Sequence, residues 1–431
     1  MAAANTVSTA ANYMKRVYTM PETTAQVVKA NPTLKMLKRD GSKLCNGEAF
    51  YITVKTHEGY GTYNTWETGS GYNYRPSTNV RYLIDTPVYT YCNVDFSNEL
   101  LSRNEKSENM LLNIFKDAVK DSNNKVSNSL ERAFWAGDSR ECLGTTTADP
   151  GVVAANASFT LAVNAKAIYN VEVGMKLGFN DDEAGAGDGL VATCYVTAKD
   201  IGALTLTCTA ITACTSLTGA DYIFLLDGAS TTGANSLPVS PSAKHRGFQS
   251  WIPSAAPSDS FLGVTRTGLG EAVYGWRFTF QGSIEESIKN AMVQMGRHVT
   301  QNLRDFYFCM GAGDWYTLEQ ELGQRVVRDP AASQTVGTEV INVRTPFGLV
   351  KCIVIPCLTD GRCFGVDFSS WTLHHDKGIP HIVDEDGQTL RLNTRGAVDS
   401  ASANDGVQMV LRARTFFTCE APIRNCTIAL T

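Results

Sequence analysis

The chain has 431 residues, of which 43% are hydrophobic and 19% charged, with a formal net charge of −5 at pH 7. This length exceeds what one hydrophobic core usually supports, so we expect two or three folding units. The acidic balance argues against a protein whose main task is binding phosphate backbones, and no apolar run is long enough to span a bilayer. Lys15 and Arg16 follow a small polar stretch, the wrong order for a signal peptide, so we expect folding in the cytoplasm.

Residues 1–45 are polar and irregular, with Pro21 and Pro32 as breakers of regular structure. They predict an extended N-terminal arm with at most short helices. An arm of this kind needs a neighbour to lie on.

Residues 46–97 predict a long β-hairpin, because apolar and polar residues alternate from Phe50 to Lys55 and a returning strand follows from about Val80 to Phe96. The loop between the strands combines glycines with large aromatic residues. Since so short a loop cannot bury these rings, we expect them to contact a neighbouring subunit or a flat ligand such as a sugar. The candidate contact residues are Tyr60, Tyr63, Trp66, Tyr72 and Tyr74, with Lys55 on the first strand.

A long amphipathic helix is predicted from about residue 104 to residue 136, where the chain has neither proline nor glycine. Roughly thirty residues would reach ~45 Å, more than a small domain requires. The apolar residues that recur at helical spacing are Leu111, Phe115, Val119, Val126, Leu130 and Phe134.

The composition changes at residues 157–228, where short β-prone runs alternate with Gly, Asp and Thr turns. Five or so short strands predict a small barrel or sandwich. Because the chain afterwards returns to mixed helix and strand, we interpret this segment as an inserted domain.

The remaining residues predict two further helices and several strands. Ser283 and Glu286 form a capping-box pattern at the start of one helix, and a second is predicted across 315–326. Turns at Asp360-Gly361 and Asp386-Gly387 each predict a hairpin, and a long strand follows from about residue 407. The class is therefore α+β with an inserted β domain.

No pattern predicts catalysis. The twelve cysteines are scattered without a CxxC pair and are interpreted as buried reduced thiols. The glycines at 185–189 and the acidic residues at 181–183 are interpreted as solvated turns, not as a phosphate cradle or a calcium site. No nucleophile elbow, HExxH pair or P-loop is present. We expect no catalytic residue and no cofactor.

A histidine cluster is the remaining candidate for chemistry. His374, His375 and His381 lie near Asp376 and could in principle bind zinc or manganese. Adjacent residues on a strand point to opposite faces, however. We therefore favour surface residues and expect no metal site.

The order of these elements and several local motifs resemble the major capsid proteins of tailed double-stranded DNA bacteriophages, the Hong Kong 97-type fold. The resemblance covers about residue 46 to the end. No helical, highly charged segment of about a hundred residues precedes the hairpin, so a scaffold would be a separate protein or already removed. The motifs are NVRYLIDTPVYTYCNVDFSNELLSRN, LERAFWAGD, GFQSWIPSAAPSDSFLGVTR, PFGLVKCIVIPCLTDGRCFGVDFSSWTLHH and ARTFFTCEAPIRNCTIAL.

The resemblance implies a division of the chain into an N-terminal arm (1–45), an extended β-hairpin or E-loop (46–97), the spine helix of a peripheral domain (98–150), an inserted small β-barrel domain (151–235), the return of the peripheral domain (236–300) and an axial domain with the closing strands (301–431). It implies a structural protein of the virion that assembles in the host bacterial cytoplasm. Hexamers and pentamers would form an icosahedral shell, with scaffolding and portal proteins as partners, cement proteins left open, weak non-specific proximity to packaged DNA and no membrane.

Three other functions remain open. A cellular encapsulin-type compartment would share the fold but is disfavoured by the inserted domain and the chain length. A carbohydrate-binding or adhesion protein would use the hairpin aromatics, but the reduced-looking cysteines and the absent signal peptide argue against it. An enzyme ranks third, because the sequence predicts no convergent polar site.

Overall fold

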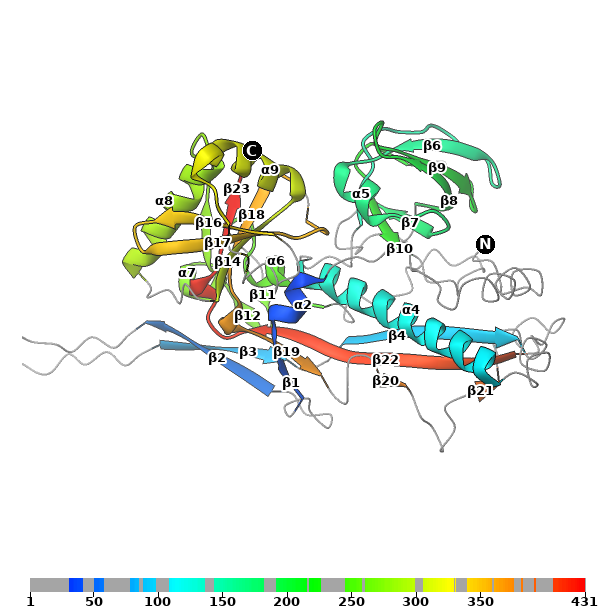
Figure 1. Cartoon of the computed structure of the whole chain (residues 1–431), viewed down its shortest axis with the longest axis horizontal. Helices are drawn as coiled ribbons and strands as arrows, with labels where there is room; N and C mark the ends of the chain where they lie inside the picture. Colours follow the sequence, from blue (N-terminus) through cyan, green and yellow to red (C-terminus); the bar gives the residue numbers. More distant parts are fainter. Residues whose placement is uncertain are drawn as a thin grey trace, which may run out of the picture.

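The structure is a computed structural model of the chain (Figure 1). Among the described residues, no helix is both long enough and apolar enough to cross a membrane. The described residues are 31–41, 50–57, 78–84, 88–97, 108–135, 143–181, 191–214, 217–225, 245–257, 260–298, 305–328, 330, 339–358, 360–375, 381–382, 391–392 and 406–430.

A six-stranded sheet is built around the longest strand, β22. Strand β4 pairs with β22 along one edge, and β19, β20 and β21 pair with its other edge. The edge strand β1 pairs in parallel with β19. The bounds are β1 (Lys38–Asp40), β4 (Val88–Ser97), β19 (Trp371–His375), β20 (His381–Ile382), β21 (Arg391–Leu392) and β22 (Gly406–Cys419).

One strand prediction for this region is wrong. The returning strand of the hairpin is two strands: β3 (Thr78–Ile84) pairs with β2 (Phe50–His57), whereas β4 pairs with β22. Pro87, which has no backbone N–H to donate, separates them in the sequence. The turn predicted at Asp386-Gly387 lies outside the described residues; the short strands on either side of it, β20 and β21, each pair with β22.

The predicted long helix is confirmed as α4 (Glu108–Trp135), whose 28 residues extend about 42 Å. It lies along the sheet formed by β4 and β22 (Figure 1). Val126, Leu130 and Phe134 are buried as the spacing predicts, and Val119 packs against β22.

A seven-stranded sheet has the order β13-β23-β18-β14-β17-β16-β15. The hairpin predicted at Asp360-Gly361 is wrong, because β14 lies between β17 and β18, parallel to the first and antiparallel to the second. The bounds are β13 (Trp276–Phe278), β14 (Phe306–Met310), β15 (Val327–Arg328), β16 (Val340–Thr345), β17 (Gly348–Val354), β18 (Arg362–Asp367) and β23 (Cys426–Ala429).

Two helices pack on this sheet, and both were predicted. Helix α8 (Ile284–His298) starts with the Glu286 N–H donating to the Ser283 Oγ at 3.2 Å, as the capping-box pattern predicts. Helix α9 (Ala312–Leu322) ends in a short 3-10 turn. Helix α8 shares its core with this sheet.

A second six-stranded sheet, with α5, forms what we call the β unit, the described residues from 143 to 225, which lies beside the rest of the chain in Figure 1. Its strands are antiparallel in the order β5-β10-β7-β8-β9-β6, and a bridge between Thr146 and Val163 links its first and last strands. Strand β5 lies ahead of the predicted boundary at residue 151, and α5 was not predicted. The bounds are β5 (Gly144–Thr145), β6 (Ser158–Ala162), α5 (Ala165–Asn170), β7 (Lys176–Asn180), β8 (Ala192–Asp200), β9 (Thr205–Ala210) and β10 (Tyr222–Leu225).

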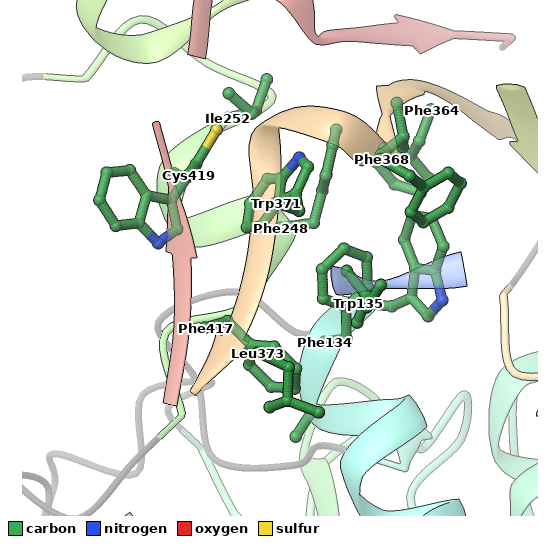
Figure 2. Close-up of a cluster of buried hydrophobic side chains, with 14 of the residues drawn as sticks. Phe134, Trp135, Phe248, Ile252, Phe364, Phe368, Trp371, Leu373, Phe417 and Cys419 are labelled. Carbon is green, nitrogen blue, oxygen red and sulfur yellow. The ribbon is translucent and has the colours of Figure 1, made fainter. Parts of the chain in front are cut away.

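Short elements complete the fold and surround a central aromatic core (Figure 2). The Phe134 ring lies 5.0 Å from that of Trp371 and 5.3 Å from that of Phe417, both close to perpendicular. This core joins segments from residue 34 to residue 419. The short elements are α2 (Pro32–Met36), α6 (Phe248–Trp251), α7 (Glu271–Tyr274), β11 (Ser260–Phe261) and β12 (Val264–Thr265).

Candidate functional site

The predicted contact residues of the hairpin are placed only in part. Lys55 lies on β2, in register with Asn79 of β3. Tyr60, Tyr63, Trp66, Tyr72 and Tyr74 lie outside the described residues.

The base of the hairpin is anchored to the central core by Tyr82 of β3. Its ring packs edge-on against Trp251 at 4.9 Å, and its hydroxyl donates to the Val273 carbonyl at 2.9 Å. Burial raises the pKa of this hydroxyl, which keeps it a neutral donor. On the opposite face of the hairpin, Tyr51 is 63% exposed. The hairpin is therefore fixed at its base and presents an aromatic side chain to solvent.

A second exposed aromatic surface lies on the sheet formed by β4 and β22. Tyr89 and Tyr91 are 44% and 52% exposed, and their rings stack at 6.1 Å. The guanidinium groups of Arg412 and Arg414 lie 6.0 Å and 5.3 Å from the Tyr89 ring centroid, within the range of a cation–π contact. We call these four residues the sheet-face patch.

The alternation of β-strand side chains explains why this patch is open. Cys92 of β4 faces the other side of the sheet, where it packs against Met409 and Leu411 of β22. Val119 of α4 joins that cluster, so α4 covers one face of the sheet. The opposite face, within the described part of the chain, carries exposed tyrosines beside arginines. Sequence reasoning missed this patch, although the alternation in VYTYCNV and VLRARTF predicts it.

The histidine prediction is wrong for His374, which is buried and not on the surface. Its Nε2 is hydrogen-bonded to the Thr418 Oγ1 at 2.9 Å and its ring stacks on Phe416 at 4.7 Å. Its Nδ1 lies 3.9 Å from the Asp40 carboxylate of β1. His374 therefore joins three strands. Across the described ranges, no three histidine, cysteine or acidic residues lie together in a way that could hold a metal ion.

The thiols are placed as predicted. Eight of the ten described cysteines are buried, all ten are unpaired, and Cys45 and Cys142 lie outside the described residues. Burial raises the pKa of several of them, including Cys309 and Cys352, so these thiols stay protonated. They act as small apolar side chains.

Asp367, Ser369 and Trp371, at the corner between β18 and β19, belong to a buried polar network. Asn425 accepts through its Oδ1 from the Asp367 N–H at 2.9 Å and from the Trp371 Nε1 at 3.1 Å. Asp367 accepts from the Ser369 N–H and hydroxyl, at 3.0 Å and 2.6 Å. This network is structural: it fixes the corner between β18 of the seven-stranded sheet and β19 of the six-stranded sheet around β22.

Residues 31–41, which we call the strap, lie on their own chain, although an arm lying on a neighbour was predicted. Pro32 is not a breaker here but the first residue of α2, where its missing N–H costs nothing. The carboxylate of Glu131 on α4 accepts from the N–H groups of Thr33 and Leu34 at 3.2 Å and 3.1 Å. Sequence reasoning also missed this contact.

Comparisons with known proteins give the fold. No protein-family model matches the chain, and no curated sequence matches it. The chain is similar to a chain of the cyanophage A-1(L) capsid asymmetric unit, with 10% identity over 95% of this chain and 94% of that chain and a TM-score of 0.52. It is also similar to the capsid of the native GTA particle, with 10% identity over 95% and 93% of the two chains, but the TM-score of 0.44 is too low to support an argument. The first likeness shows that the chain shares the fold of that phage capsid chain.

Proposed function

We propose that this chain is the major capsid protein of a tailed double-stranded DNA bacteriophage, a structural subunit and not an enzyme. The observation that carries the proposal is the shared fold with a cyanophage capsid chain over 95% of the present chain. At this level of identity the likeness concerns the fold, so the shell function rests on further features of this chain.

Two exposed surfaces support self-assembly. The hairpin projects from an anchored base, and the sheet-face patch combines stacked tyrosines with arginines. Tyrosine and arginine are enriched where protein interfaces carry most of their binding energy. In the proposed shell, the hairpin of one subunit lies over the sheet of its neighbour, and many weak contacts add through avidity.

The domain organisation belongs to the same proposal. The hairpin is the E-loop and α4 the spine of a peripheral domain in a Hong Kong 97-like fold. The seven-stranded sheet with α8 and α9 is the axial domain, and the β unit is an inserted barrel, an assignment supported by the bridge that links its first and last strands. Hexamers and pentamers would tile an icosahedral shell in the virion, with scaffolding and portal proteins as partners in the bacterial cytoplasm.

Sedimentation velocity of the full chain tests this proposal. We expect discrete fast-sedimenting species as concentration rises, with the chain alone or with the scaffolding protein encoded beside it. Tyr91→Ser should weaken assembly at least tenfold, whereas Tyr169→Ser, which changes a 56% exposed tyrosine of the β unit, should not. A monomer at every concentration, with and without the scaffolding protein, contradicts the proposal.

A further inference from the structure

The strap is held at both of its ends by groups that can take up a proton. At its helical end, Glu131 binds α2, and at its strand end, Asp40 lies beside His374. The strand end also pairs with β19, from Lys38 opposite Thr372 to Asp40 opposite His374. Docking of residues 31–41 therefore combines these polar contacts with the burial of Leu34 and Leu37 in the central core.

Glu131 is an unusual carboxylate because it is only 2% exposed and lies on the apolar face of α4. Its two oxygens take the N–H groups of the second and third residues of α2, which no residue within that helix can satisfy. The Trp135 Nε1 donates to the Thr33 Oγ1 at 3.0 Å beside it. The strap thus supplies both of the backbone N–H groups that the carboxylate accepts and covers it from water.

The charges around Glu131 do not compensate for this burial. Within the described residues, no cationic side chain forms an ion pair with Glu131; the nearby titratable groups are the thiols of Cys309 and Cys357, which burial keeps protonated. Arg132 follows on α4, and Arg39 of the strap donates to the Leu34 carbonyl. A charged carboxylate buried without a counter-ion is costly, so burial favours its neutral form.

We propose that docking of the strap on α4 is coupled to protonation of Glu131, so that the strap is held more tightly at acidic pH and released more readily at alkaline pH. This inference goes beyond the proposed function and does not depend on it. The strap is then a segment whose docking on α4 depends on pH.

The sign follows from two opposing effects. Burial favours the acid, whereas hydrogen bonding by the Thr33 side chain, by the N–H groups of Leu34 and Thr33 and by the Trp135 side chain favours the anion; burial is the larger effect and raises the pKa of Glu131 from 4.5 to about 7. Undocking exposes the carboxyl to water and returns its pKa toward 4.5. Docking therefore takes up a proton between these values, and its advantage is full below pH 4.5 and lost as pH rises through 7.

Two histidines also lie at the strap, and their contribution must be separated from that of Glu131. The His374 Nδ1 lies 3.9 Å from the Asp40 carboxylate, and His375 lies close to Gly41 of the strap. The proposal assigns the effect to Glu131, so the effect must persist in a His374→Gln variant.

Hydrogen–deuterium exchange of the full chain tests the pH dependence of strap docking. Protection factors for the peptide covering residues 31–41, corrected for the intrinsic exchange rate at each pH, should fall about 30-fold between pH 5.5 and pH 8.5. In the Glu131→Gln variant, which mimics the neutral acid, the strap should stay protected at both pH values. His374→Gln should keep the wild-type dependence.

A matched control is Glu321→Gln. The Glu321 carboxylate accepts from the N–H groups of Ile284 and Glu285, at 3.0 Å each, and so caps α8 as Glu131 caps α2. This variant should loosen α8 and leave the pH dependence of the strap unchanged. If only His374→Gln abolishes the dependence, or if Glu131→Gln retains it, the proposal is wrong.

If Glu131→Gln fails to fold, hydrogen exchange of the wild-type chain still tests the proposal. A strap whose protection does not change with pH overturns the proposal. Infrared spectroscopy adds a direct readout, because a buried protonated carboxyl has its own C=O stretch. That band should disappear with a midpoint near pH 7, and its absence at pH 5.5 also overturns the proposal.

Discussion

The β unit and the central aromatic core reach stability in opposite ways. The β unit is built from one continuous stretch of chain, and each of its strands pairs with another strand of the same stretch. Its core consists of aliphatic side chains and thiols, with Phe179 as its one fully buried ring among the described residues. The central core collects aromatic rings from α4, α6, β18, β19 and β22, which are far apart in the sequence.

The two regions should therefore respond separately to substitutions in their cores. A core made of local pairings can form without the rest of the chain. A core that joins the strap to the last long strand forms only when the whole chain is present. Tryptophan fluorescence reports on the central core and not on the β unit, because all six tryptophans lie outside residues 143–225.

The largest effect should come from Phe134→Ala. Its ring contacts Trp135, Phe248, Trp371 and Phe417, so the substitution leaves a cavity at the meeting point of the core. We expect a loss of roughly 3–5 kcal/mol in the free energy of unfolding, measured by tryptophan fluorescence in denaturant. Hydrogen exchange in the β unit should not change. A loss of stability shared by both regions would show that the two cores do not unfold separately.

A smaller and more local effect is expected for Leu206→Ala on β9. Leu206 is fully buried in the core of the β unit. We expect a cost of about 2–4 kcal/mol, visible as faster hydrogen exchange across β8 and β9. The tryptophan unfolding midpoint should stay at its wild-type value. If that midpoint falls with the β unit, the two regions fold as one.

The smallest expected effect is a loss of stability at acidic pH that involves His245. His245 is buried, is hydrogen-bonded to the Thr415 Oγ1 at 2.9 Å, and has its pKa lowered by burial from 6.5 to about 4. The stability that it contributes is present above pH 6.5 and is lost as pH falls toward 4, by about 2 kcal/mol at pH 5.

Glu131 shifts stability with pH in the opposite direction, so the wild-type curve alone would hide the contribution of His245. The measurement is therefore the difference in unfolding free energy between wild type and His245→Gln, at pH 7.5 and pH 5. The β unit contains no histidine and should be insensitive. An equal difference at both pH values would contradict the assignment to His245.

Sequence reasoning succeeded where a pattern is local. The spacing of Val126, Leu130 and Phe134 predicts α4, and Ser283 with Glu286 predicts the start of α8, because both depend on neighbours within a few turns. The strands of the β unit within residues 157–228 were predicted for the same reason, whereas β5 lies ahead of that segment.

It failed where distant segments meet. Nothing near Asp360-Gly361 indicates that β14 inserts between β17 and β18. The pairing of β1 with β19 joins residues 38–40 to residues 372–374, which no local pattern encodes. Glu131 could have been found, since it lies four residues before Trp135 on the buried side of a predicted helix. The predicted aromatic contacts at the hairpin tip lie outside the described residues and remain a prediction.

Assembly is the central claim, and negative-stain imaging tests it most directly. The full chain would be expressed alone and then with the proteins encoded beside it, and both preparations imaged. We expect closed shells, or rings of five and six subunits, in at least one of them. Uniform small particles the size of one subunit in both preparations would contradict the proposal that this chain forms a capsid.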